Sequence, residues 1–206
     1  MNTRSDRTSK PIAKPSGSDE VRAAILAAAG RHFARHGTAA SLRDIATDAQ
    51  VNLGLIHRHF GNKDDLIRAV LESHATAGAG LASRSTDLAG AVQEIFGHNA
   101  DGGQYIKTLA WLLLENAPIE QFQTQYPTIN ALRDLATSED QQLHLLGAFA
   151  LIYGWTVFGD QLLAAFGHKP RARRQVEQQL TVIIGRLVSS QWQPRPPPTM
   201  TLHHSV

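Results

Sequence analysis

The sequence predicts an all-α protein on three observations. Apolar residues recur every three or four positions along most of the chain, which is the period of a helix. Residues that cap or end helices, among them Ser41, Asn52, Gly61 and Ser138, stand at the edges of these periodic segments. No run of alternating apolar and polar residues is bounded by turn residues, so no strand is expected.

The composition is that of a globular chain without cysteine chemistry. Its 206 residues suggest one domain, or one large and one small domain, and 42% hydrophobic residues suffice for a sizeable core. The absence of Cys excludes disulfides, thiolate metal sites and a cysteine nucleophile, and is compatible with a cytoplasmic protein. The first twenty residues lack the apolar core of a signal sequence. The longest apolar run, Leu145 to Gly159, is too short to span a membrane, so no membrane partner is expected.

Positive charge is concentrated in the first third of the chain. The net charge is +2, but residues 1–70 hold 11 Lys and Arg against 7 Asp and Glu. Such a bias supports nucleic-acid binding where it coincides with a binding motif. Residues 1–18 are a predicted disordered basic arm with two Pro and no periodicity. The arm either reaches DNA or is a solvated tail, and both alternatives stay open.

Residues 19–36 form a predicted Ala-rich helix with one apolar face. Ser18 is expected to cap this helix and Gly37 to end it. His32 and His36 have the spacing of a metal-binding pair, but no third ligand of suitable type stands nearby, so no metal is expected.

Residues 41–63 have the pattern of two short helices separated by a tight turn. Ser41 is a suitable N-cap for the first helix, and Asp44 three residues later completes a capping box. Residues 49–51 are the turn, and Asn52 can cap the second helix.

Two apolar residues, Ile56 and Phe60, would fix this second helix to the core and leave its polar residues outward. Gly61 is expected to end the helix, and Asn62 to cap the next one. A helix, a short turn and a second helix with polar residues outward is the helix-turn-helix layout.

This stretch resembles the DNA-binding segment of the TetR family of bacterial transcription regulators. The resemblance rests on R-D-I-A (43–46), A-x-V (49–51), G-x-I-x-x-H-F (54–60) and N-K-D-D-L (62–66). With the preceding helix, it covers roughly residues 20–71, whereas the remainder fits the family only in length and helical character.

The chain departs from the family pattern at two positions. Gln50 stands where the family usually has Gly; if this position needs a positive φ, Gln costs about 1 kcal/mol relative to Gly. His57 stands where the family often has Tyr and brings a titratable group that can still donate to a phosphate.

The layout and the resemblance together imply a DNA-binding surface on the second helix and its flanks. Its candidate residues are Arg43, Asn52, Leu53, Gly54, Leu55, His57, Arg58, His59 and Lys63. Arg58 could pair with a guanine edge or merely with phosphate. Leu53 and Leu55 are expected opposite Ile56 and Phe60, where they would contact thymine methyl groups, unless Leu55 packs on the first helix. The family uses the positions of His57, His59 and Lys63 for phosphate.

The remainder of the chain is predicted to be helical. The helices are expected at residues 63–83, 87–100, 102–117, 128–136, 139–166 and 170–192. The helix over 139–166 is apolar nearly all round and should therefore be buried on more than one side. The predicted domains are a DNA-binding domain over 19–71 (motif 41–60), an effector-binding and dimerisation domain over 72–192, and a disordered Pro-rich tail over 193–206.

One helix-turn-helix contacts only a few base pairs, so a homodimer on a near-palindromic DNA operator is implied. The last two long helices are the expected dimer surface, as in the family. Its candidate residues are Phe158, Leu162, Val176, Leu180, Ile183, Ile184 and Leu187.

The family resemblance implies a small-molecule effector bound among the helices of the second domain. The aromatic and polar candidates are Trp111, Glu115, Phe122, Tyr126, His144, Phe149, Tyr153 and Trp155. Aromatic residues of this kind serve equally as core, and that alternative stays open. The composition of this set favours a hydrophobic or aromatic effector, and no cofactor is expected.

Two other function classes were weighed against a DNA-binding regulator. No G-x-S-x-G, H-E-x-x-H, P-loop or G-x-G-x-x-G motif is present, so an enzyme is not expected. A helical adaptor that uses the helix-turn-helix for protein contacts is the alternative. Repression is the default of the family.

Overall fold

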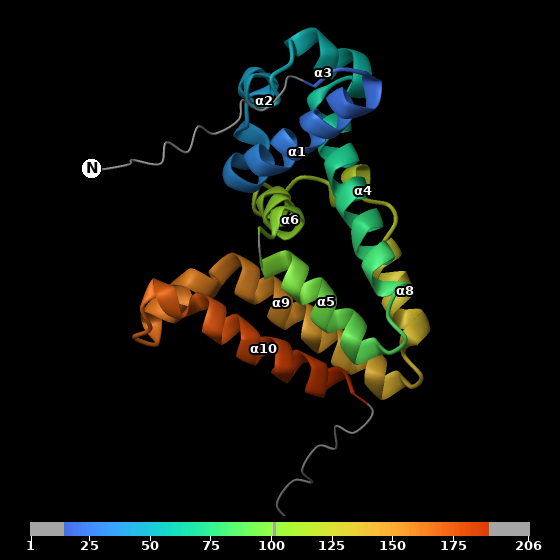
Figure 1. The fold of residues 1–206 in the computed structure, drawn as a ribbon, viewed down its shortest axis with the longest axis vertical. Helices are drawn as coiled ribbons and strands as arrows, with labels where there is room; N and C mark the ends of the chain where they lie inside the picture. The colour runs from blue at the N-terminus through green and yellow to red at the C-terminus, as the bar shows by residue number, and fades with distance from the viewer. Residues whose placement is uncertain (1–14, 101, 190–206) are drawn as a thin grey trace, which may run out of the picture. The chain divides into compact units, whose positions relative to one another are not determined.

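The computed structural model describes residues 15–100 and 102–189, and within this part of the chain it contains helices and no strand (Figure 1). The predicted all-α class is confirmed. The helices are α1 (Ser18–His36), α2 (Leu42–Asp48), α3 (Leu53–Phe60), α4 (Lys63–Ala82), α5 (Leu88–Ala100), α6 (Gln104–Leu114), α7 (Ile119–Phe122), α8 (Pro127–Leu135), α9 (Glu139–Ala165) and α10 (Arg173–Val188). Two 3-10 turns, η1 (Gly37–Ala39) and η2 (Pro170–Ala172), precede α2 and α10. The predicted arm up to residue 14 and the predicted tail lie outside the described residues.

The chain divides into two compact units. Unit 1 comprises residues 1–78 and 102–127, and unit 2 comprises residues 79–101 and 128–206. Helix α4 crosses the boundary between them near its end. The division at residue 71 drawn from the sequence differs, because it assigns α6 to the second domain, whereas α6 packs on α1 in unit 1.

Unit 1 has one core to which every helix of the motif contributes. The fully buried side chains include Ile25 of α1, Ile45 of α2, Ile56 of α3 and Leu66 of α4. Burying one such side chain stabilises the fold by about 1.5–3 kcal/mol. Short helices that are marginal alone are therefore held in place by this shared core.

Both short helices of the motif begin with the predicted side-chain caps. The Ser41 hydroxyl accepts hydrogen bonds from the backbone N–H groups of Arg43 and Asp44, at 3.2 and 3.4 Å. The Asn52 side-chain oxygen accepts from the backbone N–H of Leu55 at 3.0 Å. Each cap satisfies donors that the first turn of a helix leaves without an intrahelical partner.

The turn between α2 and α3 confirms the positive φ expected at Gln50. Gln50 has φ 56°, in the left-handed region that favours glycine. The next residue closes the turn, because the N–H of Val51 donates to the carbonyl of Ala46 at 2.9 Å. This turn sets the direction in which α3 leaves α2.

Unit 2 is built around α5, α9 and α10, which pack on one another (Figure 1). The Gln93 side chain of α5 donates to the carbonyl of Thr181 on α10 at 3.1 Å. At the start of α9, Ser138 caps the helix as predicted, and the buried Gln141 side chain donates to the carbonyl of Val188 at 3.4 Å. These bonds tie α10 to both of its neighbours.

The expectation that α9 is buried on more than one side is wrong for a single chain. Leu143 and Leu146 near its start are 65% and 67% exposed, and Phe158 near its end is 59% exposed. Residues 139–165 are apolar enough, by length and composition alone, to pass as a membrane span, yet the opposite side of α9 carries buried residues such as Leu145 and Ile152. Its apolar circumference thus combines a core face with a second, exposed face.

Several helix boundaries also differ from the prediction. Gly17 with φ 100°, rather than Ser18, occupies the N-cap position of α1, and no side chain caps this helix. The segment between Pro118 and Pro127 contains the short helix α7, which four residues are too few to reveal by periodicity. Pro127 begins α8 instead of interrupting it, because the first turn of a helix needs no N–H there.

The ends of two later helices are shorter than predicted. Helix α6 ends at Leu114, and Asn116 beyond it has a positive φ that no helix can continue. The last helix was expected over residues 170–192. Its beginning is instead the 3-10 turn η2, and Ser189 in an extended conformation ends α10.

Replacing Gln50 with Gly should stabilise unit 1 without changing any contact of α3. Relief of the left-handed strain of an L-residue, less the extra unfolded-state entropy of Gly, leaves a gain of about 1 kcal/mol. Urea unfolding measures this gain. Asn116→Gly is the matched control, because Asn116 has φ 54° but Asn tolerates this region, so its gain should be smaller. Equal changes in the two variants would contradict the strain at Gln50.

Candidate DNA interface and effector cavity

The outward face of α3 is set by the two side chains that anchor it. Ile56 is fully buried and Phe60 nearly so, which confirms the predicted anchors. Side chains four residues apart lie on one side of a helix, so the opposite side faces solvent. Gly54, His57 and Arg58 are exposed there.

The start of α3 combines a cap with an open backbone. The Asn52 oxygen is occupied by the cap, whereas its amide N–H₂ remains available to another acceptor. A Cβ added at Gly54 would lie 3.2 Å from the Asn52 Oδ1 atom. Glycine at this position therefore leaves the cap uncrowded and the first turn of α3 accessible.

Leu53 and Leu55 lie differently from the expectation. Both are half-buried and pack against the core of unit 1 instead of pointing away from Ile56 and Phe60. An eight-residue helix that sits in a concave core buries residues on its flanks as well as on its anchored side. Packing accounts for both leucines, and no thymine contact is needed to explain them.

The candidate cations fall into two groups. Arg43 and Arg58 are exposed, and among the described residues nothing pairs with either guanidinium. Lys63 is half-buried, and its ammonium group donates to the backbone carbonyl of Thr38 in the turn before α2. Lys63 thus fastens the start of α4 to η1, a contact that its expected role at phosphate did not include.

The two histidines of α3 differ in their surroundings. The exposed His57 has its Nδ1 atom 3.0 Å from the carbonyl of Gly61, which requires the proton on Nδ1 and leaves Nε2 outward. His59 is half-buried, with its ring centroid 6.4 Å from that of Phe60. His57 is therefore the better placed of the two for an external acceptor when it is protonated.

The start of α4 is fixed by a reciprocal cap. The Asn62 side-chain oxygen accepts from the N–H of Asp65 at 3.0 Å, and the Asp65 carboxylate accepts from the N–H of Asn62 at 3.1 Å. Arg68 donates to the same carboxylate at 2.8 Å. The hydrogen bond from Arg68, followed by that from the Asn62 N–H, lowers the pKa of Asp65 below its ordinary value.

Helix α1 braces the motif through charged side chains. Arg31 and His32 approach the Asp48 carboxylate at the end of α2, at 2.9 and 3.3 Å. The Arg22 guanidinium lies over the ring of Phe60, 4.6 Å from its centroid. His32 therefore has a carboxylate partner on α2, and its ring is 6.2 Å from that of His36.

The effector candidates are spread over both units. Four of them belong to unit 1 and four to unit 2, namely Trp111, Glu115, Phe122 and Tyr126 in the first and His144, Phe149, Tyr153 and Trp155 in the second. Phe122 is part of the buried core, which supports the core alternative for this residue. Phe149 and Tyr153 meet edge to face, with centroids 5.8 Å apart.

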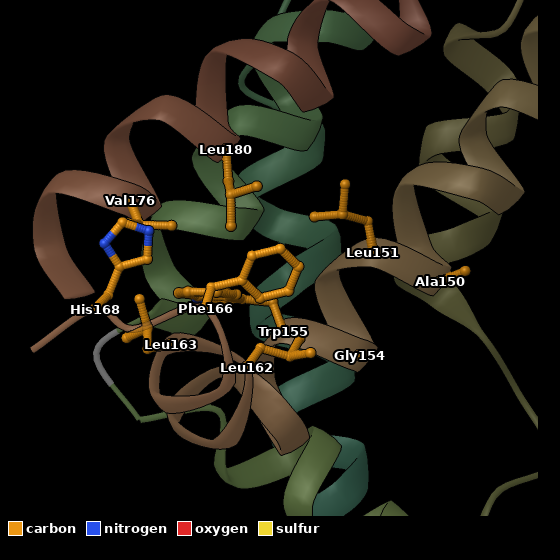
Figure 2. A pocket seen from close by; sticks show the side chains of 10 residues that line it. All are labelled: Ala150, Leu151, Gly154, Trp155, Leu162, Leu163, Phe166, His168, Val176 and Leu180. Atoms are coloured by element: carbon orange, nitrogen blue, oxygen red, sulfur yellow. The ribbon is translucent and has the colours of Figure 1, made fainter. Parts of the chain in front are cut away.

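Unit 2 contains an apolar cavity between α9 and α10 (Figure 2). Its volume is ≈ 480 Å³, and Trp155 is the effector candidate that lines it. Phe166 and His168 from the connection between the two helices also line it, and sequence analysis missed both. The signal was the Gly167 and Pro170 break, because it joins two apolar helices into a hairpin whose side chains face one another.

The candidate dimer residues differ in accessibility. Phe158 and Leu162 of α9 and Ile183 of α10 are exposed. Val176, Leu180 and Leu187 are half-buried. Ile184 is fully buried inside its own unit, so its expected place in the dimer surface is wrong. A helical stripe inferred from periodicity covers both the core face and its margin, and Ile184 lies on the core side.

The fold and the geometry of α2 and α3 define a helix-turn-helix protein with a separate helical unit. Residues 25–70 match the family model of bacterial regulatory proteins of the tetR family. The HTH-type transcriptional repressor Rv3405c of Mycobacterium tuberculosis is 36% identical over 168 residues, which cover 74% of this chain and 81% of that protein. The chain belongs to the TetR family and is a DNA-binding transcription regulator of that family.

Other relatives support the family at the level of sequence segment and of fold. The HTH-type transcriptional regulator TtgR of Pseudomonas putida is 47% identical over 55 residues, which cover 26% of each chain. The crystal structure of SCO4942 from Streptomyces coelicolor, described as a candidate transcriptional regulator, superposes with a TM-score of 0.58 at 26% identity. It covers 80% of this chain and 96% of that one.

Replacing Asp65 with Asn should destabilise the protein at neutral pH and much less in acid. The pKa of Asp65 is lowered in the folded state, so its contribution is complete above the ordinary Asp pKa and is lost as the pH falls through the lowered value. Urea unfolding at pH 6 and below pH ~4 measures this difference.

Asp64→Asn is the matched control for this experiment. Asp64 is exposed in the same turn and takes part in neither the cap nor the pair with Arg68. An acid-dependent difference as large for Asp64→Asn as for Asp65→Asn would contradict the assignment to the cap.

Proposed function

We propose that the protein is a cytoplasmic transcription repressor that binds a near-palindromic DNA operator as a homodimer and is released by a small apolar effector. The observation that carries the proposal is the exposed side of α3, on which Arg58 stands next to the uncrowded start of the helix. Two anchored residues on the other side, Ile56 and Phe60, hold this surface in one orientation. The printed name of the mycobacterial relative, a repressor, supports the sign of regulation.

The proposed interface separates positioning contacts from contacts with bases. Arg43 at the first turn of α2 and the outward Nε2 of His57 are placed to meet phosphates on either side of α3. Arg58 and the Asn52 amide project from α3 and its start, where a recognition helix meets base edges. His59 and Lys63 remain proposed phosphate contacts. Lys63 keeps two further N–H donors beside its bond to Thr38.

A dimer follows from the need for two such modules on one duplex. The exposed apolar side of α9 continues onto α10 at Val182 and Ile183, which are 47% and 51% exposed. A monomer would leave this apolar surface in water, whereas a two-fold partner would cover it with the same surface. The pairing of two helices from each chain is the proposed arrangement.

The experiment that tests the function is a selection of bound duplexes from random DNA with the full chain at moderate salt. Recovery of an inverted repeat supports a dimeric DNA-binding regulator with specific sites. Recovery of a single half-site contradicts the dimer. Recovery of no sequence above background contradicts specific DNA recognition and favours the adaptor alternative.

Arg58→Ala should relax the sequence preference at one base-pair position of each half-site. Loss of one bidentate base contact costs about 1–3 kcal/mol on the preferred duplex and little on duplexes that differ there. Competition binding against single-base variants measures the profile. Arg43→Ala is the matched control and should weaken all duplexes alike, because a phosphate contact carries no sequence information. An equal loss on every duplex for Arg58→Ala would show that Arg58 contacts phosphate only.

Phe158→Glu combined with Ile183→Glu should convert the dimer into a monomer. Both side chains are exposed in a single chain, so the charges should leave each protomer folded while opposing association. Sedimentation and circular dichroism measure the two effects. Leu114→Glu, which places the same charge at a 75% exposed residue of unit 1, is the control and should remain dimeric. An intact dimer in the double variant would place the interface elsewhere.

A further inference from the structure

The cavity between α9 and α10 has walls that are almost entirely apolar. Leu151, Trp155, Leu162 and Phe166 come from α9 and its end, and Val176 and Leu180 come from α10 (Figure 2). Its volume of ≈ 480 Å³ is within the range of about 300–1,000 Å³ typical of small-molecule sites. An apolar space of this size is costly to leave filled with water.

The Trp155 wall is held in place by side chains outside the cavity. Its indole N–H donates to the Glu177 carboxylate at 3.1 Å, and Arg173 donates to the same carboxylate at 2.8 Å. The Arg173 guanidinium lies 5.3 Å from the Trp155 ring. Trp155 is therefore fixed before any ligand arrives, and this wall of the cavity is preorganised.

Two glycines of α9 shape the site in different ways. A Cβ at Gly159 would lie 3.1 Å from the Trp155 ring, so glycine lets this ring lie against the helix. A Cβ at Gly154 would meet no atom within 4 Å, because Gly154 opens onto the cavity. The absence of a side chain at Gly154 leaves space that a ligand can occupy.

One polar side chain faces this apolar space. The imidazole of His168, from the segment joining the two helices, lies at the cavity beside Val176 and Phe166 (Figure 2). The indole N–H of Trp155 is already bonded to Glu177, so His168 is the group left to orient a polar atom of a ligand. A single hydrogen-bonding group in an apolar site fixes orientation more than affinity.

We propose that this cavity binds a small planar aromatic molecule with one hydroxyl group directed at His168, and that this molecule is the effector. The regulatory part rests on the proposed function. The rim includes Leu162 and Phe166, which are exposed at the end of the apolar side of α9 proposed to pair in the dimer. Occupation of the cavity is thereby coupled to the spacing of the two DNA-binding units through α9 and α10.

The binding test uses equilibrium dialysis of the full chain against 2-naphthol and against naphthalene. We expect saturable binding of 2-naphthol with one molecule per chain. Gly154→Leu should weaken this binding about tenfold or more, because the new side chain fills the cavity. Gly147→Leu is the matched control. Gly147 lies two turns earlier on the same side of α9, outside the cavity, and a Cβ there meets only Leu187 at an ordinary 3.7 Å.

The role of His168 has its own measurement. His168→Ala should weaken 2-naphthol about threefold to tenfold through loss of one hydrogen bond, and should leave naphthalene unchanged. Equal losses for both compounds would overturn the orienting role. The absence of saturable binding, or equal binding by the Gly154 and Gly147 variants, would overturn the site. Binding only by the Phe158→Glu and Ile183→Glu double variant would mean that a second copy fills the cavity instead.

The effector role is tested by DNA affinity with and without saturating 2-naphthol. The wild type should lose affinity for its selected duplex, and Gly154→Leu should keep it. Binding of 2-naphthol with unchanged DNA affinity would overturn the effector role. A protein that binds no duplex contradicts the proposed function, and the dialysis then still decides whether the cavity takes the ligand.

Discussion

The burial of Ile56 and Phe60 is the constraint on which the rest of the DNA-binding surface depends. Helix α3 has eight residues, too few to be stable alone, and these two side chains join it to the core that α1 and α4 also share. Once they are buried, the outward position of Arg58 follows from helical geometry. The caps at Ser41, Asn52 and Asn62 do not choose this face; they fix where each helix starts and so keep the register.

The DNA-binding unit was predictable because its determinants are local. Cap residues, the helical period and the positive φ at Gln50 all depend on neighbours within a few positions, and each was found where the sequence placed it. The half-burial of Leu53 and Leu55 depends on the shape of a core that forms from distant segments. For the same reason, the bond from Lys63 to Thr38 could not be inferred, since 25 residues separate them.

The second unit was less predictable because composition does not distinguish its three kinds of apolar surface. Helix α9 buries Ile152, exposes Phe158 and lines a cavity with Trp155, and all three residues are equally apolar in the sequence. The aromatic candidates were chosen by type, and the fold distributes them over two units. What identifies the cavity is an interaction between positions, namely the lock of Trp155 by Glu177 and Arg173 next to an open Gly154.

The central claim is that the surface held outward by Ile56 and Phe60 binds the phosphate backbone and base edges of duplex DNA. The salt dependence of binding to a selected duplex tests this claim most directly, because neutralised phosphates release counterions. The account predicts that the logarithm of the association constant falls linearly with the logarithm of salt concentration, by about 0.9 per phosphate contact. A slope close to zero, or binding that is equally strong at all salt concentrations, would contradict it.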